Sequence, residues 1–233
     1  MRTNYTRREE KEYNLFRTLF QKFVCSGLYA TYCKTVFDLK VEGYRDELKD
    51  KKFIVAGNHI SALEPFLVPH AIRKPVAFLA KKELFEGFWS RLYMDFLGAI
   101  AVDRKKLEVS TIKTALSIKN TNWTLGFFPQ GTRQQKEEFS NITRGFATLA
   151  KATKCDILPI ATIGADEKSR HPFKSKIVMK IGNLIPYSNN IDEMVDQWGE
   201  SISHLTGTEY KPRIKSWKKK KSMQGNMLKI LIF

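Results

Sequence analysis

The chain has 233 residues, of which 42% are hydrophobic and 12% aromatic, a composition that is ordinary for one globular domain with a sizeable core. Its 40 Lys and Arg against 24 Asp and Glu give a formal net charge of +16, which predicts an anionic partner such as phospholipid headgroups, a phosphorylated substrate, an acidic carrier protein or nucleic acid. The three cysteines lack the spacing of zinc ligands or of a disulfide framework, and no apolar run approaches the ~20 residues of a spanning helix.

The first predicted element is an amphipathic helix between Tyr13 and Phe37. Its apolar residues recur at helical spacing: Phe16, Leu19, Phe20, Phe23, Leu28, Tyr32 and Val36. The span from Phe23 to Cys33 carries no charge, as in a helix that lies in a bilayer interface. The alternative is a helix packed on the protein's own core. Residues 1–11 are charged and are expected to be mobile, and 40–52 are expected to be a polar connection.

The run Phe53–Gly57 predicts a short buried strand that delivers Asn58 and His59 into a turn before a helix. Open α/β sheets place their chemistry at the carboxyl ends of strands, which makes His59 a candidate general base. Ser61 and Glu64 also fit a capping box at the start of the helix, so Glu64 has a purely structural alternative. The two roles are compatible.

A second strand is predicted at Pro75–Ala80 and a third at 100–102, with an aromatic-rich helix from Leu84 to Leu97 between them. Lys81 and Lys82 follow the second strand, and a right-handed crossover would place them at the same edge of the sheet as His59; the alternative is that they are solvated surface charges. Arg104 follows the third strand. The aromatic helix either borders a ligand groove or packs on the core. Residues 105–120 predict an exposed amphipathic helix that turns Leu107, Ile112, Leu116 and Ile118 inward.

The run Trp123–Phe128 predicts another buried strand, which leads into Pro129–Arg133. This loop contains a glycine, a hydroxyl and a guanidinium, and such a loop suits an anion. A helix is predicted from Thr143, strands at 157–163 and 177–181, and a closing helix at 191–205. The basic tail from Lys211 onward suits an anionic membrane surface; a functionally silent terminus is the alternative.

The corner Asn58-His59 with Glu64, followed by Phe128-Pro129-Gln130-Gly131-Thr132-Arg133, resembles the glycerolipid acyltransferases, specifically the 1-acylglycerol-3-phosphate acyltransferases. Two further blocks between and beyond these motifs support the resemblance: Ala80–Phe85 with Leu97–Arg104, and Leu158–Ile160. Together the matching blocks span roughly residues 40–208.

The resemblance implies a single α/β domain with a mixed, largely parallel sheet flanked by helices and preceded by the N-terminal amphipathic segment. The expected division is a membrane-associating segment at 1–39, a catalytic domain at 40–208 and a basic tail at 209–233. It implies transfer of a fatty acyl group from acyl-CoA or acyl-carrier protein to a lysophospholipid, 1-acylglycerol 3-phosphate. We expect no metal or other cofactor, no nucleic acid partner, and a peripheral or monotopic position on the cytoplasmic face of the cell membrane.

Carried over residue by residue, the resemblance makes His59 and Glu64 the catalytic pair. The expected substrate-binding residues are Asn58, Lys82, Arg104, Gln130, Gly131, Thr132 and Arg133, with Arg104 and Arg133 on the substrate phosphate because guanidiniums offer bidentate hydrogen bonds.

Two positions depart from the family pattern: Glu64 stands where Asp is usual, and Gln130 where Glu is usual. They keep open a second reading, a catalytically impaired member that binds anionic lipid. A third interpretation is a basic nucleic-acid-binding protein. The positive net charge supports it, but the sequence contains no helix-turn-helix, zinc or RNA-binding motif. The sequence contains no Gly-x-Ser-x-Gly elbow, and no Cys beside a motif His, which disfavours an acyl-enzyme.

Overall fold

A parallel-dominated sheet forms the centre of the molecule. The structure is a computed structural model that describes residues 5–102, 109–133, 138–139, 142–166 and 170–212. The described residues form a seven-stranded sheet whose strands are, in spatial order, β1 (Lys40–Glu42), β8 (Val178–Ile181), β7 (Asp156–Ile163), β2 (Phe53–Gly57), β5 (Thr124–Phe127), β3 (Val76–Lys81) and β4 (Ile100–Val102). Neighbours pair in parallel except β7 with β8, which confirms the predicted mixed, largely parallel sheet.

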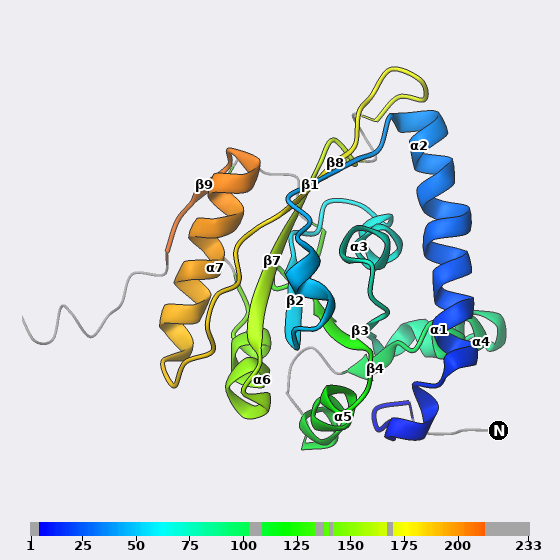
Figure 1. The fold of residues 1–233 in the computed structure, drawn as a ribbon, viewed down its shortest axis with the longest axis vertical. Helices are drawn as coiled ribbons and strands as arrows, with labels where there is room; N and C mark the ends of the chain where they lie inside the picture. Colours follow the sequence, from blue (N-terminus) through cyan, green and yellow to red (C-terminus); the bar gives the residue numbers. More distant parts are fainter. Residues whose placement is uncertain (1–4, 103–108, 134–137, 140–141, 167–169, 213–233) are drawn as a thin grey trace, which may run out of the picture.

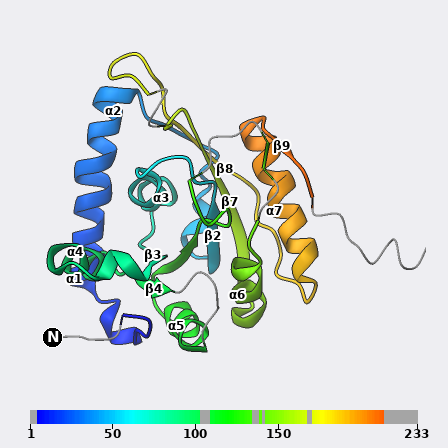
Figure 2. The same cartoon turned by 180° about the vertical axis from the view of Figure 1, so that it is seen from behind.

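Helices cover both faces of the sheet (Figures 1 and 2). One side carries α3 (Glu64–Ile72) and, outside it, the long N-terminal helix; the other carries the helices that follow β4, β5 and β8. The α-helices after the N-terminal one are α3, α4 (Phe88–Phe96), α5 (Val109–Lys119), α6 (Gly145–Thr153) and α7 (Ile191–Thr206), and the short 3-10 helices are η1 (Glu10–Glu12), η3 (Asp46–Lys49) and η4 (Lys82–Phe85).

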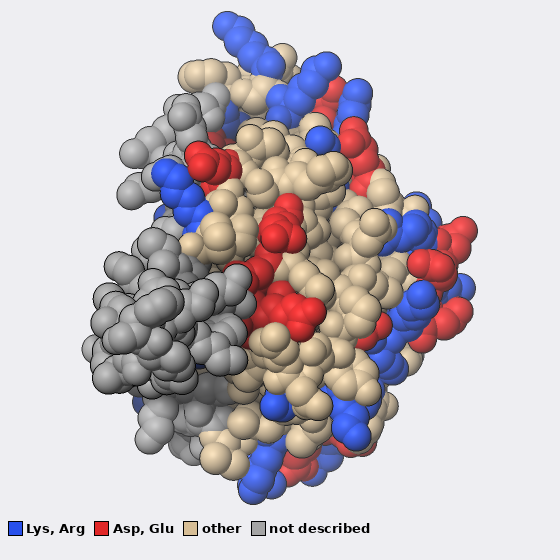
Figure 3. Space-filling view, turned by 90° about the vertical axis from the view of Figure 1, so that its left-hand side faces the viewer, with Lys and Arg blue, Asp and Glu red and all other residues tan. Residues whose placement is uncertain are grey.

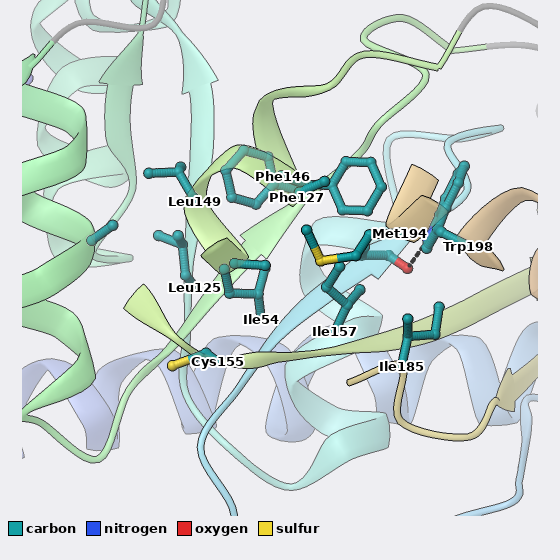
Figure 4. Packing of buried hydrophobic residues seen from close by; sticks show 14 of the residues in the cluster. Ile54, Leu125, Phe127, Phe146, Leu149, Cys155, Ile157, Ile185, Met194 and Trp198 are labelled. Carbon is teal, nitrogen blue, oxygen red and sulfur yellow. Dashed lines mark hydrogen bonds between the residues drawn. The ribbon is translucent and has the colours of Figure 1, made fainter. Parts of the chain in front are cut away.

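Strand β2 separates two hydrophobic cores because successive side chains of a strand point to opposite faces. Ile54 and Ala56 belong to the core beneath α5, α6 and α7, whereas Phe53 and Val55 belong to the core beneath α2 and α3. Figure 4 shows the first core, in which the indole N–H of Trp198 donates a 2.9 Å hydrogen bond to the carbonyl oxygen of Ala56. This bond ties α7 to the strand that carries the predicted catalytic turn.

The N-terminal helix runs without a break through α1 (Leu15–Lys22), a π-helix η2 (Phe23–Ala30) and α2 (Thr31–Phe37). The wider π-helical turns accommodate a five-residue step in the apolar pattern, from Phe23 to Leu28. Val24, Cys25, Ala30, Cys33 and Phe37 are buried against the protein, while Phe16, Leu19, Phe23, Leu28 and Tyr32 are exposed. One face of this helix therefore packs on the protein's own core, and the other face is apolar and uncovered.

Three strands lie in segments that were not predicted to contain any. Residues 40–52 include β1 and η3 instead of a plain connection, and a further strand, β6 (Glu138–Phe139), pairs in parallel with β9 (Glu209–Tyr210). The edge strand β1 has only one half-buried residue, Val41, between two exposed charged ones, so it lacks the apolar run by which buried strands are recognised.

Two expectations about burial were wrong. Leu116 was expected to turn inward, but it is exposed; α5 buries Ile118, as expected, together with Thr111, Thr114 and Ala115. The Thr114 hydroxyl is satisfied by the backbone N–H of Arg8, at 3.0 Å. Arg8 itself lies in the segment expected to be mobile, yet it is buried and pairs with Asp95 at 2.9 Å. Leu107 lies outside the described residues.

Candidate active site

The turn after β2 lies between the ends of two neighbouring strands. The register pairs Ala56 with Phe127 of β5 and Gly57 with Ile160 of β7. The residues that follow β2 are thereby brought beside Phe128–Arg133 on one side and Thr162 on the other. The sheet thus brings together the two motifs that the sequence holds far apart.

His59 and Glu64 form a tight hydrogen-bonded pair. Nδ1 of His59 lies 2.7 Å from Oε2 of Glu64, whose side chain is fully buried, while the His59 side chain is only 15% exposed. With the Nδ1 proton donated to the carboxylate, the lone pair of the neutral ring is on Nε2. The imidazole is therefore held in the orientation and tautomer of a general base.

Only one half of the capping box expected from Ser61 and Glu64 is present. Oε2 of Glu64 accepts the backbone N–H of Ser61 at 3.0 Å, but the hydroxyl of Ser61 accepts the N–H of Leu63, at 3.1 Å, and not that of Glu64. Helix α3 begins at Glu64, with Pro65 in its first turn and with Leu63 as an N-cap that makes no side-chain capping bond. The same oxygen of Glu64 therefore serves the turn before the helix and the imidazole.

Burial raises the pKa of Glu64 above its ordinary value, and this effect exceeds the opposing hydrogen bonds and charge of His59 and the backbone bonds of Ser61 and Ile60. Oε1 of Glu64 has no hydrogen-bond partner among the described residues. A carboxyl group kept in an unfavourable environment beside a histidine is typical of functional sites.

Three neighbouring side chains fix the position of His59. The amide of Gln130 accepts the backbone N–H of His59 at 2.7 Å, and the ring of Phe128 stacks on the imidazole with centroids 4.4 Å apart. Asn58 bridges to β7, where it donates to the carbonyl of Thr162 at 2.9 Å and accepts its N–H at 2.7 Å. Asn58 and Gln130, predicted to bind substrate, are thus seen here as supports of the histidine.

His59 lines an apolar cavity of about 310 Å³ between α3, β3 and α4. Its apolar lining includes Phe66, Phe78, Leu84, Met94, Leu97 and Phe128, so residues of the aromatic segment 84–97 do border it. Two cationic residues, Lys81 and Arg133, line the same cavity. The cavity therefore combines an apolar interior with a histidine and two cations.

The remaining predicted substrate residues are distributed as follows. Lys82 is exposed at the start of η4 and does not line the cavity, which is lined instead by Lys81. Gly131 has a φ of +73° that favours glycine, and its N–H donates to the carbonyl of Phe128 at 2.9 Å; Thr132 is exposed. The backbone N–H of Gly131 is therefore already engaged within the loop. Arg104 lies outside the described residues.

Sequence reasoning missed two members of this site, Phe128 and Arg170. Phe128 lay inside the quoted motif, and its position directly before the loop was the signal for a ring against the histidine. Of the two lysines expected at this edge of the sheet, Lys81 lines the cavity and Lys82 does not. Arg170, whose guanidinium lies 3.4 Å from the Ser61 hydroxyl and over the Phe37 ring at 4.9 Å, had no signal in the sequence.

The site is equipped for proton transfer without a protein nucleophile. All three cysteines are buried, and none lines the His59 cavity. Within the part of the chain that the structure describes, no group of three or more His, Cys, Asp or Glu side chains could hold a metal ion. A base, an orienting carboxylate, two cations and an apolar cavity suit attack by a hydroxyl group on an acyl donor.

Comparison with known proteins identifies the fold and the family. The acyltransferase family model matches residues 38–163, more than half of the chain. The structure resembles the crystal structure of the 1-acyl-sn-glycerophosphate acyltransferase PlsC from Thermotoga maritima, with a TM-score of 0.63 and 22% identity, covering 84% of this chain and 83% of that one. At that identity the likeness supports the fold.

Curated relatives carry one recurring description. The 1-acyl-sn-glycerol-3-phosphate acyltransferase of Streptococcus pneumoniae is 29% identical over 168 residues, which cover 70% of this chain and 60% of that protein. The enzyme of the same description from Bacillus subtilis is 29% identical over 138 residues, covering 57% of this chain and 66% of that protein. The matches thus span less than two thirds of either relative. The matched family model, which includes both motifs of the site, shows that the chain belongs to the acyltransferase family.

Proposed function

We propose that the protein transfers a fatty acyl group from an acyl thioester to the free hydroxyl of 1-acylglycerol 3-phosphate, giving phosphatidate. The observation that carries this proposal is the His59–Glu64 pair at the wall of an apolar cavity that Lys81 and Arg133 also line. The apolar interior suits a fatty acyl chain, and the two cations suit the acceptor phosphate. The relatives described above as acyltransferases for this acceptor support the same choice.

The reaction follows from the orientation of the imidazole. Nε2 of His59 takes the proton of the acceptor hydroxyl while its oxygen attacks the thioester carbonyl carbon. The carboxylate of Glu64 stabilises the imidazolium that results. As the new C–O bond is completed and the C–S bond breaks, the imidazolium returns its proton to the leaving thiolate. The products are the ester and a free thiol of coenzyme A or acyl-carrier protein.

The two departures from the family pattern are compatible with activity. The longer side chain of Glu64 still reaches Nδ1 of His59 at 2.7 Å, so the extra methylene does not break the pair. Gln130 still accepts the backbone N–H of His59. Both observations favour an enzyme over an impaired lipid-binding member of the family.

The test is an assay of the purified full chain with an acyl thioester and either 1-acylglycerol 3-phosphate or 1-acylglycerol, with released thiol measured. We expect thiol release with the phosphorylated acceptor, phosphatidate as its product, and little release with the acceptor that lacks phosphate. No release above the protein-free rate with either acyl-CoA or acyl-carrier protein as donor would contradict the proposal.

Replacing Gln130 with glutamate is expected to raise turnover about two- to fivefold, because a carboxylate accepts the His59 N–H in a stronger, charge-assisted bond. The measurement is kcat in the thiol-release assay. Gln197→Glu on the exposed face of α7 adds the same charge away from the site and serves as the control. An equal or lower kcat in Gln130→Glu would show that the added charge does not assist the histidine.

We further propose that the uncovered apolar face of the N-terminal helix lies against the membrane. Among the described residues, no helix combines the length and the apolar composition needed to cross a bilayer. The exposed apolar side chains of the N-terminal helix are joined by those of η4 and α4: Leu84, Phe88 and Trp89, the last 77% exposed. Phe16 and Phe20 contact Phe96 of α4, so the two groups belong to neighbouring elements.

The opposite side of the molecule has a different character. Figure 3 shows the face on the side of α7, where acidic side chains gather near the middle and the visible Lys and Arg lie mainly toward its edges. The sequence of helix α7 contains four acidic residues: Asp192, Glu193, Asp196 and Glu200. Acidic side chains in the middle of this face would be repelled by anionic lipid, which favours docking through the N-terminal helix. We propose this docking for the cytoplasmic face of the cell membrane.

Replacing Leu28 with serine is expected to weaken binding to phospholipid vesicles about tenfold, because a leucine loses roughly 1.5–3 kcal/mol of apolar transfer free energy. Vesicle co-sedimentation measures the effect. Leu116→Ser on α5 is a matched control, since Leu28 is 51% and Leu116 43% exposed. Equal losses in the two variants would contradict docking through the N-terminal helix.

A further inference from the structure

A second cavity, of about 680 Å³, lies between the N-terminal helix and the carboxyl-terminal end of α3. It is larger than the cavity at His59, and Gln21 is the one lining residue that the two share. The Gln21 side chain is held by the carbonyls of Val76 and Leu97 and by the N–H of Val76, each at 2.8 Å. His59 lies before the first residue of α3, whereas this cavity adjoins the last residue of that helix. The two ends of α3 are about 13 Å apart, because the helix has nine residues. The two cavities are therefore separate sites.

The lining of this second cavity is strongly cationic. Lys22 and Lys34 come from the N-terminal helix, and Arg73 and Lys74 come from the turn after α3. None of the lining residues is Asp or Glu, and within the described part of the chain no carboxylate oxygen lies within 4.0 Å of any of these four cations. Four cations around one cavity repel each other, and an anion placed among them would relieve that repulsion.

Two of the cations are held in place by aromatic rings. The guanidinium of Arg73 lies 4.2 Å from the centroid of the Tyr44 ring, and the ammonium of Lys74 lies 5.0 Å from that of Phe53. Lys74 also donates to the backbone carbonyl of Lys51 at 2.7 Å. Burial and then the charge of Lys52 lower the pKa of Lys74, against the opposing charge of Asp50. The wall formed by these residues is thus ordered before any ligand binds.

A neutral polar pair completes the lining. Nδ1 of His70 lies 3.0 Å from the hydroxyl oxygen of Ser26. Burial, followed by the charges of Lys34 and Arg73, lowers the pKa of His70. The pair adds hydrogen-bond donors to the charges, which is the combination that binds phosphate oxygens.

The carbonyl end of α3 offers a simpler reason for part of this cluster, because cations stabilise the carboxyl end of a helix. That reason covers His70 and Arg73. It does not cover Lys22 and Lys34, which reach the cavity from the opposite wall and are exposed.

We propose that this cavity binds a phosphate group, with Lys22 and Lys34 on one side, Arg73 on the other, and Ser26 and His70 between them. The phosphate belongs either to the headgroup of an anionic lipid or to a soluble phosphate ester. Lys22 directly precedes Phe23, which is 61% exposed on the face proposed to meet the membrane, so a headgroup has access to the cavity. The site is independent of the His59 chemistry and of the proposed reaction.

The decisive experiment is an NMR pH titration of the histidine side chains of the full chain, with and without inorganic phosphate. Bound phosphate should raise the pKa of His70 by about one unit, because an added negative charge stabilises the imidazolium. His171 and His204, both exposed, should titrate unchanged. The shift should be lost in Lys22→Gln/Lys34→Gln and kept in Lys113→Gln/Lys174→Gln, a pair of exposed lysines outside the cavity.

If phosphate leaves the His70 titration unchanged, or shifts it equally in both double variants, the proposal is overturned. The source of the phosphate is then distinguished by co-sedimentation with phosphatidylcholine vesicles that contain or lack phosphatidate. A lipid headgroup is supported if the His70 pKa shifts with phosphate and if phosphatidate increases the affinity for vesicles. That increase should then fall about tenfold in Lys22→Gln/Lys34→Gln and not in the control pair. A His70 shift with equal vesicle binding by both variants supports a soluble phosphate ester. Because thiol release uses His59, failure of this site leaves the proposed reaction standing.

Discussion

The His59→Ala variant is expected to lose about 100- to 10,000-fold in the rate of thiol release from an acyl thioester, because the acceptor hydroxyl then lacks its general base. The fold should survive. His59 lies in a turn with its ring stacked on Phe128, and its backbone N–H, which donates to Gln130, is kept in alanine. Single-turnover and steady-state assays with 1-acylglycerol 3-phosphate measure the loss.

His204→Ala on α7 provides the matched control, since this histidine is exposed and lies outside the cavity. It should keep the wild-type rate. Binding of the acceptor by His59→Ala should be nearly unchanged, so the loss should be in kcat more than in KM. A His59→Ala variant with a rate close to wild type would rule out the histidine as the base, whatever other residues contribute.

Replacing Glu64 with glutamine is expected to lower kcat by about 1,000-fold while raising the temperature of unfolding. The amide keeps the shape and the hydrogen bonding of the side chain, but it no longer stabilises the imidazolium. The gain in stability follows from burial, which is the largest influence on this carboxyl and raises its pKa. Removing the charge removes that unfavourable burial.

The sign of the pH dependence follows from the same shift. Because the pKa of Glu64 is higher in the folded than in the unfolded state, the folded protein binds the proton more tightly. Wild type therefore loses this part of its stability as the pH rises from the ordinary carboxyl value through the raised one. The advantage of Glu64→Gln should grow across that window and be constant above it, as followed by thermal unfolding at several pH values.

Glu200→Gln, an exposed change of the same kind on α7, should alter neither kcat nor the pH dependence of unfolding by a comparable amount. If Glu64→Gln unfolded at a lower temperature than wild type at neutral pH, the bonds from His59 and Ser61 would outweigh the burial of the carboxylate. The Glu64 carboxylate would then stabilise the folded protein, and it would not be a group that the reaction requires at the expense of stability.

The sequence predicted the central strands because they are buried on both faces. Phe53–Gly57, Val76–Lys81, Thr124–Phe127 and Asp156–Ile163 are apolar runs of strand length between turn signals, and each appears in the sheet. The fold class followed from their alternation with helices. The strand order did not follow from the sequence: the structure shows that β2 and β5 are parallel neighbours, which brings their ends together.

The features that could not be predicted from the sequence are those that depend on tertiary contacts. The edge strand β1 has the charges of a loop, because an edge needs few apolar residues. Arg8 is buried only because Asp95 and the carbonyl of Ala99 receive its guanidinium. Lys81 and Lys82 were both expected at the end of β3, and the sequence could not distinguish which of them lines the cavity; the structure shows that Lys81 does. No local pattern contains this information.

The π-helical stretch Phe23–Ala30 determines which insertions and deletions the N-terminal helix can tolerate. Deleting one residue there and letting the helix return to regular α geometry would keep the residues beyond the deletion nearly in phase with the first turns, because a π turn holds about one residue more than an α turn. Tyr32 would stay close to the line shared with Phe16 and Phe23, and Cys33 and Phe37 would stay close to the core. An added residue with no such compensation would instead rotate everything beyond it by about 100°. A single deletion should therefore be tolerated better here than a single insertion.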